Sequence, residues 1–449
     1  MSNSYSEVHI EPLEKQIMSK VTWKLVPFLC ICFMASFLDR VNVGFAKEQM
    51  VADLGFSTTV YGLGAGVFFI GYFLFEVPSN LIMVKLGSRV WIARIMVVWG
   101  FVSASMAFVH TATGFYVLRF LLGASEAGFF PGIILYLTYW FPLSYRSRTV
   151  ALFMTAAVLS NVIGGPLSGV LLKLDGVGDI RGWKWLFVSE ALPSIILGVV
   201  VFFRLPSGPK EATFLTPSER GWLIDRLARE GKQNVGTHDL SFLQTAADPR
   251  VLLLCAVYFA NVIGGYGLDF FLPTLMKKAF PTLDSGLVGT LVGVPSLFAI
   301  VAMIIHGRSS DRRGERRWHV ASALWWAALG LLLASFPIPP IAGLAALALA
   351  VSGRWSTIAP FWGLSTSFLA TSSVSGMAGA IAMINAVGNL GGFAGPFMMG
   401  WMKDQTGDYT VGLRILATAM FLGGVLALMV RLNRAGELKA GGTSNSLAG

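Results

Sequence analysis

The chain is poor in charged residues and in the residue types that form disulfides or hold metals. Charged side chains make up 13% of its 449 residues, whereas hydrophobic residues make up 55%, and this balance lies outside the range of soluble globular domains. Its three cysteines, Cys30, Cys32 and Cys255, all lie in apolar segments, where we interpret them as packing residues. The sequence therefore predicts neither a disulfide framework nor a metal site.

Signatures of nucleotide-driven or enzymatic chemistry are also missing. The chain has no Gly-x-x-x-x-Gly-Lys-Ser/Thr loop, and the glycine-rich stretch GLGAGVFFIG at 62–71 follows no predicted strand. Its glycines therefore indicate helix packing and not a phosphate site. No large soluble domain and no nucleophile–base set is apparent. We expect neither an enzyme nor an ATP-driven pump, and no bound cofactor.

Long apolar runs are what the chain has in abundance. They recur from Trp23 to Leu432, with lengths of roughly 20 residues that suffice to cross a hydrocarbon core about 30 Å thick as α-helices. Twelve spans are predicted, at residues 23–46, 58–85, 90–110, 113–140, 147–173, 183–204, 250–279, 284–306, 317–336, 339–369, 374–402 and 409–432. The first 22 residues lack the features of a signal peptide, so we expect the first span to stay in the mature chain.

One long polar segment separates the sixth and seventh predicted spans. In it, Thr216, Pro217 and Glu219 have the spacing of a helix N-cap, first turn and capping box, which predicts a short amphipathic helix at the cytoplasmic surface. KLGSR and DRRGERR, and likewise GGPLSG and AGPFMMG, recur at nearly the same offset, which indicates two repeated halves. The expected parts are a cytoplasmic N-terminal segment at 1–22, a six-helix bundle at 23–204, a linker at 205–249, a second six-helix bundle at 250–432 and a cytoplasmic tail at 433–449.

The net charge of +10 follows a topological pattern. If both termini are cytoplasmic, most Lys and Arg residues fall in the terminal segments and the even-numbered connections, which is the positive-inside distribution. The basic balance therefore indicates orientation in a cell membrane, most simply a bacterial inner membrane, and we expect no nucleic-acid partner. Three arginines are exceptions that lie inside predicted spans, namely Arg40, Arg119 and Arg354.

The loop after the eighth predicted span carries a specific motif. GRSSDRRGERR at 307–317 resembles the signature loop of the major facilitator superfamily, Gly-x-x-x-Asp-Arg-x-Gly-x-Arg-Arg. Gly307 and Gly314 permit close helix approach and a tight turn, and Asp311 with Arg312 is expected to act as a latch for one conformation. The alternative is a solvated basic loop that only sets topology. The matching first-half loop, KLGSR, lacks the aspartate.

Within that superfamily the chain resembles the anion:cation symporters, permeases for organic acids such as tartrate, galactonate and phthalate. The resemblance runs nearly end to end and rests on SFLDRVNVGFA, GYFLFEVPSNL, RFLLGASEAGFFPG, YGLDFFLPTL, APFWGL and INAVGNLGGFAGP. It implies twelve transmembrane helices in two six-helix pseudo-repeats, a monomer, and import of a small organic anion with protons by alternating access.

The segment 119–132 places two charges in an apolar run. Seven residues of helix advance about 700°, so Arg119 and Glu126 share one face. A charge at the bilayer centre costs at least about 2.5 to 3.5 kcal/mol, so we expect both side chains to face a polar cavity. There Arg119 can bind a substrate carboxylate, and Glu126, released from Arg119, can take up a proton. The family resemblance assigns the same roles to these two residues.

Further site residues come from the resemblance in the first half. It assigns Arg40 to substrate binding, Asp39 to proton coupling and Tyr72 to a hydrogen bond with substrate, whereas a buried structural ion pair is the alternative for Asp39 and Arg40. We interpret Glu76, one turn from Tyr72, as a partner for backbone groups freed by a nearby proline.

The second half contributes polar candidates of its own. Asn385 and Asn389 can donate amide hydrogens to substrate, and Trp362 can form a wall of the cavity, with helix packing as the alternative for each. Arg354 departs from the family pattern. We hypothesise that it selects dianions; snorkelling, or pairing with Glu190 or Asp269, is the alternative.

The sequence thus predicts a carrier that imports a small organic anion with protons. A hydroxylated dicarboxylate such as tartrate is the first expectation, followed by a sugar acid and an aromatic acid. An anion channel-like pore is the alternative from another class, and a drug exporter is the nearest rival within the superfamily.

Overall fold

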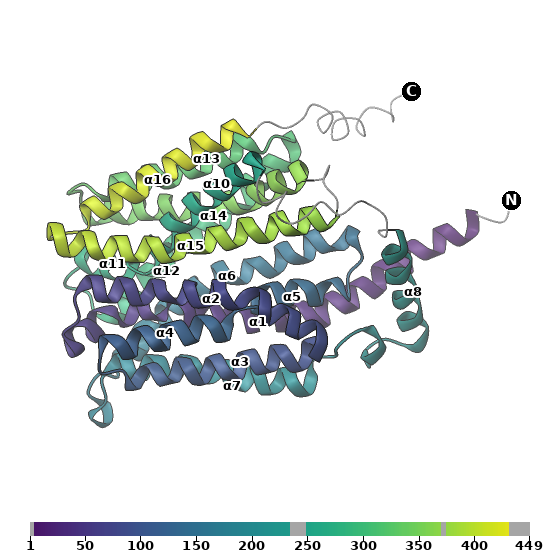
Figure 1. The fold of residues 1–449 in the computed structure, drawn as a ribbon, viewed down its shortest axis with the longest axis horizontal. Coiled ribbons are helices and arrows are strands. Elements are labelled where there is room, and N and C mark those ends of the chain that lie inside the picture. Colours follow the sequence, from purple (N-terminus) through teal and green to yellow (C-terminus); the bar gives the residue numbers. More distant parts are fainter. Residues whose placement is uncertain (1–3, 234–247, 370–373, 431–449) are drawn as a thin grey trace.

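The computed structural model describes residues 4–233, 248–369 and 374–430, and all regular elements in these ranges are helices (Figure 1). The first half contains α1 (Ser4–Leu54), α2 (Thr58–Leu86), α3 (Ser88–Ser105), α4 (Ala112–Glu126), α5 (Phe129–Thr138), α6 (Leu143–Leu172) and α7 (Gly182–Arg204). The second half contains α10 (Pro249–Asp269), α11 (Leu272–Ala279), α12 (Ser285–Arg313), α13 (Arg317–Ala334), α14 (Pro340–Leu369), α15 (Val374–Thr406) and α16 (Thr410–Met429). The predicted all-α membrane fold is confirmed, whereas the predicted tail at 433–449 lies outside the described residues.

Eleven segments of the described chain are long and apolar enough to cross a membrane. The ninth predicted span is present as α13 but is not among the eleven, because this helix starts with Arg317, Trp318 and His319, which lower its hydropathy. It nevertheless packs closely on α14. A Cβ at Gly330 would lie 2.4 Å from the backbone nitrogen of Ala350, so only a glycine permits this approach.

The fourth predicted span is broken in the middle. Helix α4 ends at Glu126 and α5 starts at Phe129, and between them Gly128 has a φ of +86°, in the left-handed region that favours glycine. A Cβ at Gly128 would also clash with Ser79 of α2. Glu126 is therefore held at a helix break, next to freed backbone groups, and not in the middle of a continuous helix.

The two halves meet along two seams of glycine. In the first seam, α2 contacts α15, and a Cβ at Gly62 would lie 2.4 Å from the carbonyl oxygen of Pro396. In the second seam, α6 contacts α12, and a Cβ at Gly165 would lie 2.3 Å from the carbonyl oxygen of Gly289. Small residues let these backbones approach closely, so the halves fit tightly near the first turns of α2 and α12.

Polar contacts join the halves at the same end of the bundle. The carboxylate of Asp404, on α15, accepts a hydrogen bond from the backbone nitrogen of Thr59 on α2 at 2.6 Å. Lys173, which follows α6, forms an ion pair with Asp284 at the start of α12, with a distance of 2.9 Å. This end lies opposite the N-terminus and helix α8 (Figure 1).

Lys47 is a buried charged group at this end of the bundle, which we call the closed end because the two halves contact each other there. Its Nζ atom, on α1, donates to the hydroxyl of Tyr409 at 2.9 Å and of Thr274 at 3.2 Å, both in the second half. The rings of Tyr61, Phe271 and Tyr409 surround the ammonium at 5.3 to 5.6 Å from their centroids. Hydrogen bonds and cation–π contacts therefore compensate for its desolvation.

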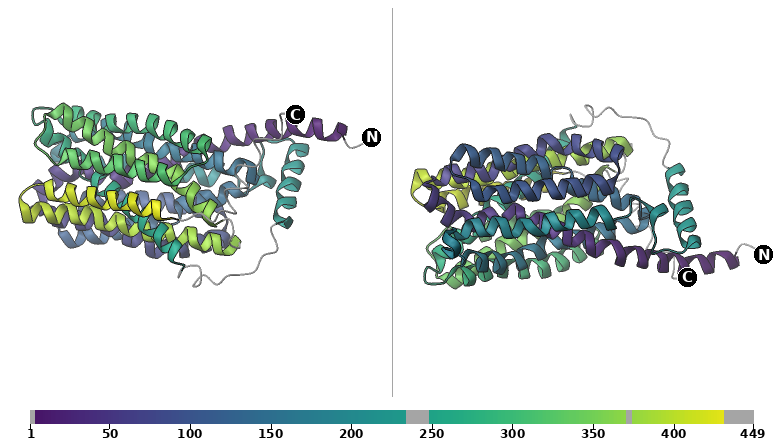
Figure 2. Two further views of the ribbon diagram at one scale, coloured as in Figure 1. Left: turned by 90° about the horizontal axis from the view of Figure 1, so that it is seen from above. Right: turned by 90° about the horizontal axis from the view of Figure 1, so that it is seen from below.

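The linker carries α8 (Pro217–Gln233) at the other end of the bundle (Figure 2). The predicted capping box is present: the backbone nitrogen of Thr216 donates to Glu219 at 2.9 Å, and that of Glu219 donates to Thr216 at 3.3 Å. Glu219 also forms an ion pair with Lys20 at 2.5 Å. Lys20 belongs to α1, which runs without interruption from the N-terminal segment into the first span.

Candidate functional site

An ion pair between Arg40 and Glu126 lies at the centre of the first half. Arg40 projects from α1, and its Nη2 atom contacts Glu126 Oε1, which also accepts a hydrogen bond from Ser36 at 2.7 Å. The Nη1 atom of Arg40 donates to the hydroxyl of Tyr266, on α10 of the second half, at 3.1 Å. The expected partner of Glu126 was Arg119, and the structure corrects this, because α1 brings Arg40 closer to the end of α4.

Arg119 is fully buried and has no carboxylate partner among the described residues. Its Nε and Nη2 atoms donate to the backbone oxygens of Gly64 and Ala65 on α2, at 3.3 and 3.1 Å, while Nη1 has no partner in the described chain. The guanidinium lies 5.1 Å from the centroid of the Phe68 ring, and that of Arg40 lies 5.2 Å from the same centroid. The two cations therefore belong to one site, and Arg119 retains an unused donor.

Tyr72 lies beside these arginines on α2. It is buried, and its ring centroid is 5.3 Å from the guanidinium carbon of Arg40. The structure thus places this predicted residue in the same site as Arg40 and Glu126.

Arg354 pairs with Asp269 in the second half. The ion pair joins α14 to α10, and both side chains are buried. The guanidinium also lies 5.2 Å from the ring centroid of Tyr266 and 4.8 Å from that of Trp355. The sequence left snorkelling and pairing with Glu190 or Asp269 open for Arg354, and the structure contains the pair with Asp269. Since Tyr266 contacts both Arg40 and Arg354, the two cations flank one tyrosine from opposite halves.

Asn385 and Asn389 contact a carboxylate across the interface. Their amide nitrogens, on α15, donate to Glu76 on α2 at 2.9 and 3.5 Å. The interpretation of Glu76 as a partner for backbone groups is therefore incomplete, because its carboxylate accepts hydrogen bonds from both asparagines. Trp362 packs edge-on against Tyr258 of α10, with 5.3 Å between the ring centroids.

Asp39 lies away from this site, although it precedes Arg40 in the chain. Its carboxylate accepts hydrogen bonds from Ser194 at 2.5 Å, Ser103 at 2.8 Å and the indole of Trp99 at 3.1 Å. These partners belong to α3 and α7, on the other side of α1. The expected pair of Asp39 and Arg40 is therefore split between two environments, because consecutive residues of a helix point about 100° apart.

The signature loop is tied to its own half. Gly314 ends α12 with a φ of +62°, as a left-handed C-cap requires. Asp311 is exposed and pairs with Arg316 in the same loop at 3.6 Å, and Arg316 packs against Gly363 of α14. At Gly307 a Cβ would be 3.8 Å from Ala359, so α12 and α14 lie close there. No ion pair of this loop joins the two halves in the described chain.

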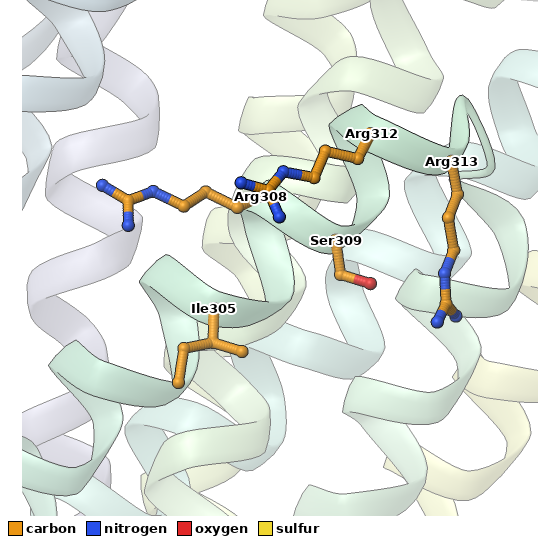
Figure 3. A pocket seen from close by; sticks show the side chains of 5 residues that line it. All are labelled: Ile305, Arg308, Ser309, Arg312 and Arg313. Atoms are coloured by element: carbon orange, nitrogen blue, oxygen red, sulfur yellow. The ribbon is translucent and has the colours of Figure 1, made fainter.

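Arg312 has a different position from the one expected of a latch. It lines an open pocket of about 410 Å³ together with Ile305, Arg308, Ser309 and Arg313 (Figure 3). The figure shows three arginine side chains around this pocket, at the end of α12. Arg312 is exposed in this pocket, and the contact with Asp311 is made by Arg316.

Tyr266 is a site residue that was not among the sequence predictions, and Asp269 was considered there only as one alternative partner of Arg354. Both lie in the quoted segment YGLDFFLPTL, so the signal was a polar pair within an otherwise apolar and glycine-rich stretch. The described residues contain no group of three or more His, Cys, Asp and Glu side chains that could hold a metal.

Comparisons with known proteins agree with this architecture. A family model described as Major Facilitator Superfamily matches residues 29–286 and 254–446. A protein of Agrobacterium vitis proposed to transport tartrate is 48% identical over 418 residues, which cover 93% of this chain and 92% of that protein. The quinolone resistance transporter of Acinetobacter baumannii is 39% identical over 417 residues, which cover 93% and 95%.

The fold is also similar to a solved structure. The inward open conformation of the xylose transporter XylE from E. coli matches with a TM-score of 0.72 and 12% identity, over 91% of this chain and 96% of that chain. At this identity the likeness concerns the fold alone.

Proposed function

The chain belongs to the major facilitator superfamily, whose members are membrane transporters and not enzymes, and we propose that it imports a small hydroxylated dicarboxylate such as tartrate together with protons. The Arg40–Glu126 ion pair beside the unpaired Arg119 carries this proposal. We further propose that the chain acts as a monomer in a bacterial inner membrane with both termini in the cytoplasm.

Competition for Arg40 couples the anion to the proton. A substrate carboxylate binds the unused donor of Arg119 and the guanidinium of Arg40, since arginine presents paired donors that match carboxylate oxygens. Glu126 then loses its counter-charge in a buried environment, which favours its protonated form. Release of the anion on the other side restores the ion pair and expels the proton.

A second carboxylate of the substrate would meet the other half. Tyr266 contacts Arg40 through its hydroxyl and Arg354 through its ring, so it is the one side chain between the two arginines. A short diacid with one carboxylate at Arg40 can therefore reach Arg354 with the other. There the second carboxylate would replace Asp269 as the partner of Arg354. Binding that engages both halves at once is what alternating access between two bundles requires.

The relatives support the substrate class from another direction. The Agrobacterium vitis protein is proposed to transport tartrate, which has the two carboxylates that this arrangement suits. The Acinetobacter baumannii relative is named for quinolone resistance, so drug export is the second candidate and a quinolone belongs among the compounds tested.

Purified protein in proteoliposomes tests the proposal. A pH-sensitive dye inside the vesicles reports protons while tartrate, galactonate, an aromatic acid and a quinolone are added outside in turn. We expect tartrate to acidify the lumen in the wild type and not in the Glu126→Gln variant, which should still exchange labelled tartrate. Uptake of labelled tartrate without acidification contradicts proton symport, and a response to the quinolone alone favours the drug exporter.

A further inference from the structure

A second polar cluster lies inside the first half, away from the arginines. Two of its members, Asp39 and Asn42, belong to α1, and two, Glu190 and Ser194, belong to α7. Ser168 of α6 completes it. All five side chains are at most 3% exposed, so the cluster is closed to bulk water.

The two helices hold these groups in register. Asp39 and Asn42 are three residues apart on α1, and Glu190 and Ser194 are four residues apart on α7, so each pair spans about one turn of one face. Ser194 donates to Asp39 at 2.5 Å, and Glu190 adjoins Asn42 one turn further along. The two carboxylates are therefore neighbours.

No cation neutralises either carboxylate. In the described chain, neither Asp39 nor Glu190 forms an ion pair with lysine or arginine. The charged group facing Glu190 from α1 is Asp39, and among the described side chains α6 contributes the hydroxyl of Ser168. Glu126, at the end of α4, is a further carboxylate that acts on Asp39. Ionising both of these interacting buried carboxyl groups, Asp39 and Glu190, is costly, because each lacks solvent and repels the other. In this conformation, one of the two carboxyl groups is therefore expected to hold a proton.

The hydrogen bonds indicate which carboxyl group takes it. Asp39 accepts from Ser194, Ser103 and the indole of Trp99, and these three neutral donors suit an ionised carboxylate. The carboxyl group of Glu190 accepts one hydrogen bond, from Ser168 at 2.6 Å, and its Oε2 atom has no partner in the described chain.

Asn42 can serve both protonation states of Glu190. Its side chain is fully buried and interacts with Glu190, while its nitrogen and its oxygen make no hydrogen bond of ordinary geometry among the described residues. The amide nitrogen can donate to ionised Glu190, and the amide oxygen can accept from the protonated acid. A fixed structural carboxylate needs only one of these options, whereas a group that changes its charge needs both.

We propose that Glu190, together with Asn42, is a proton-binding site of the first half that binds a proton in one part of the transport cycle and releases it in another. This inference rests on the proposed proton symport for its role in transport, but the binding of a proton at Glu190 does not. The carrier thus holds a proton at Glu190 in addition to the one exchanged at Glu126.

Infrared difference spectroscopy of the purified full chain tests the binding step. Spectra recorded between mildly acidic and alkaline pH should contain a carbonyl band of a buried protonated carboxyl group, and Glu190→Gln should lose this band. The control Glu211→Gln, which removes an exposed carboxylate, should keep it. If Glu190→Gln does not fold, Ser168→Ala should shift the same band, because the hydrogen bond to Oε1 is lost. A band unchanged in both variants overturns the proposal.

Transport measurements test the release step. From the reversal potential of tartrate flux, we expect Glu190→Gln to carry one proton fewer per anion than the wild type while it exchanges labelled tartrate at a comparable rate. An unchanged ratio overturns the release of this proton during the transport cycle. If the wild type does not couple tartrate to protons, the proposed function fails, and the infrared band still decides whether Glu190 binds a proton.

Discussion

Asn385 Nδ2 lies 2.9 Å from Glu76 Oε1 and joins α15 to α2 across the interface between the halves. Asn389, one turn further along, contacts the other oxygen of Glu76 at 3.5 Å. Glu76 forms no ion pair in the described chain, so these two amides are the hydrogen-bond donors to its carboxylate. The contact also places a titratable group where the two halves must separate.

Asn385→Ala should therefore destabilise the protein more than Asn389→Ala. A hydrogen bond to a charged group contributes about 1.5 to 3 kcal/mol, and the 3.5 Å contact of Asn389 lies at the limit of hydrogen-bond length. Thermal unfolding in detergent measures the difference, with Asn389→Ala as the matched control. Equal losses in the two variants would contradict the assignment of Asn385 as the main donor.

Lys47→Met should loosen the closed end of the bundle. The substitution keeps the apolar stem but removes the ammonium that contacts Tyr409 and Thr274 of the other half. Spin labels at Asp179→Cys and Lys278→Cys, introduced after the three native cysteines are replaced, should then report longer distances between the halves.

Lys173→Met is the control for this measurement. Its ion pair with Asp284 is about half exposed on both sides, and such pairs contribute only about 0 to 1 kcal/mol. We expect little change in the distance distribution. A larger opening in Lys173→Met than in Lys47→Met would refute the view that the buried lysine closes this end.

Arg354 should matter for diacids more than for monoacids. Removing it alone leaves Asp269 as a buried unpaired charge, which costs about 3 to 5 kcal/mol, so the informative variant is Arg354→Met combined with Asp269→Asn. We expect tartrate uptake to fall at least ~10-fold, as for the loss of one charged hydrogen bond.

A monoacid of similar size provides the comparison in that double variant, with Asp269→Asn alone as the control for the carboxylate. Uptake assays with both labelled acids decide the question. If the two acids lose uptake equally, Arg354 supports the fold of the second half and does not select dianions.

The contact between α8 and α1 should weaken in acid. The hydrogen bond from Lys20 and the backbone donor of Thr216 hold the pKa of Glu219 below its ordinary value. A carboxyl group whose pKa is lowered by folding stabilises the folded state above its ordinary pKa, near 4.3, and loses that contribution as the pH falls through the lowered value. The protection of the α8 backbone amides, measured relative to the intrinsic exchange rate at each pH, should fall in this acid range.

Glu219→Gln should remove most of this pH dependence, and α8 should exchange faster already at neutral pH. Glu230→Gln alters a carboxylate of the same helix that pairs with Arg226 and is the matched control. Protection of α8 that is the same in wild type and Glu219→Gln would show that Glu219 does not hold the helix.

Local features of the molecule were predictable from the sequence alone. Apolar runs long enough to cross a membrane became helices because an unsatisfied backbone is too costly in lipid. The capping box of Thr216 and Glu219 depends on residues three apart, so its geometry is set within one turn. Even α13, whose first residues lower its hydropathy, is a helix where the sequence predicted one.

The partners of the buried charges were decided by the tertiary structure. The sequence placed Arg119 and Glu126 on one face of one helix, but Arg40 of α1 reaches Glu126, and Arg119 binds backbone oxygens of α2. Helical periodicity gives the direction in which a side chain projects around the axis of its own helix. Its distance to another helix depends on how closely the two backbones pack. Glycine seams such as Gly62 with Pro396 set that distance, and no single segment of sequence contains both sides of a seam.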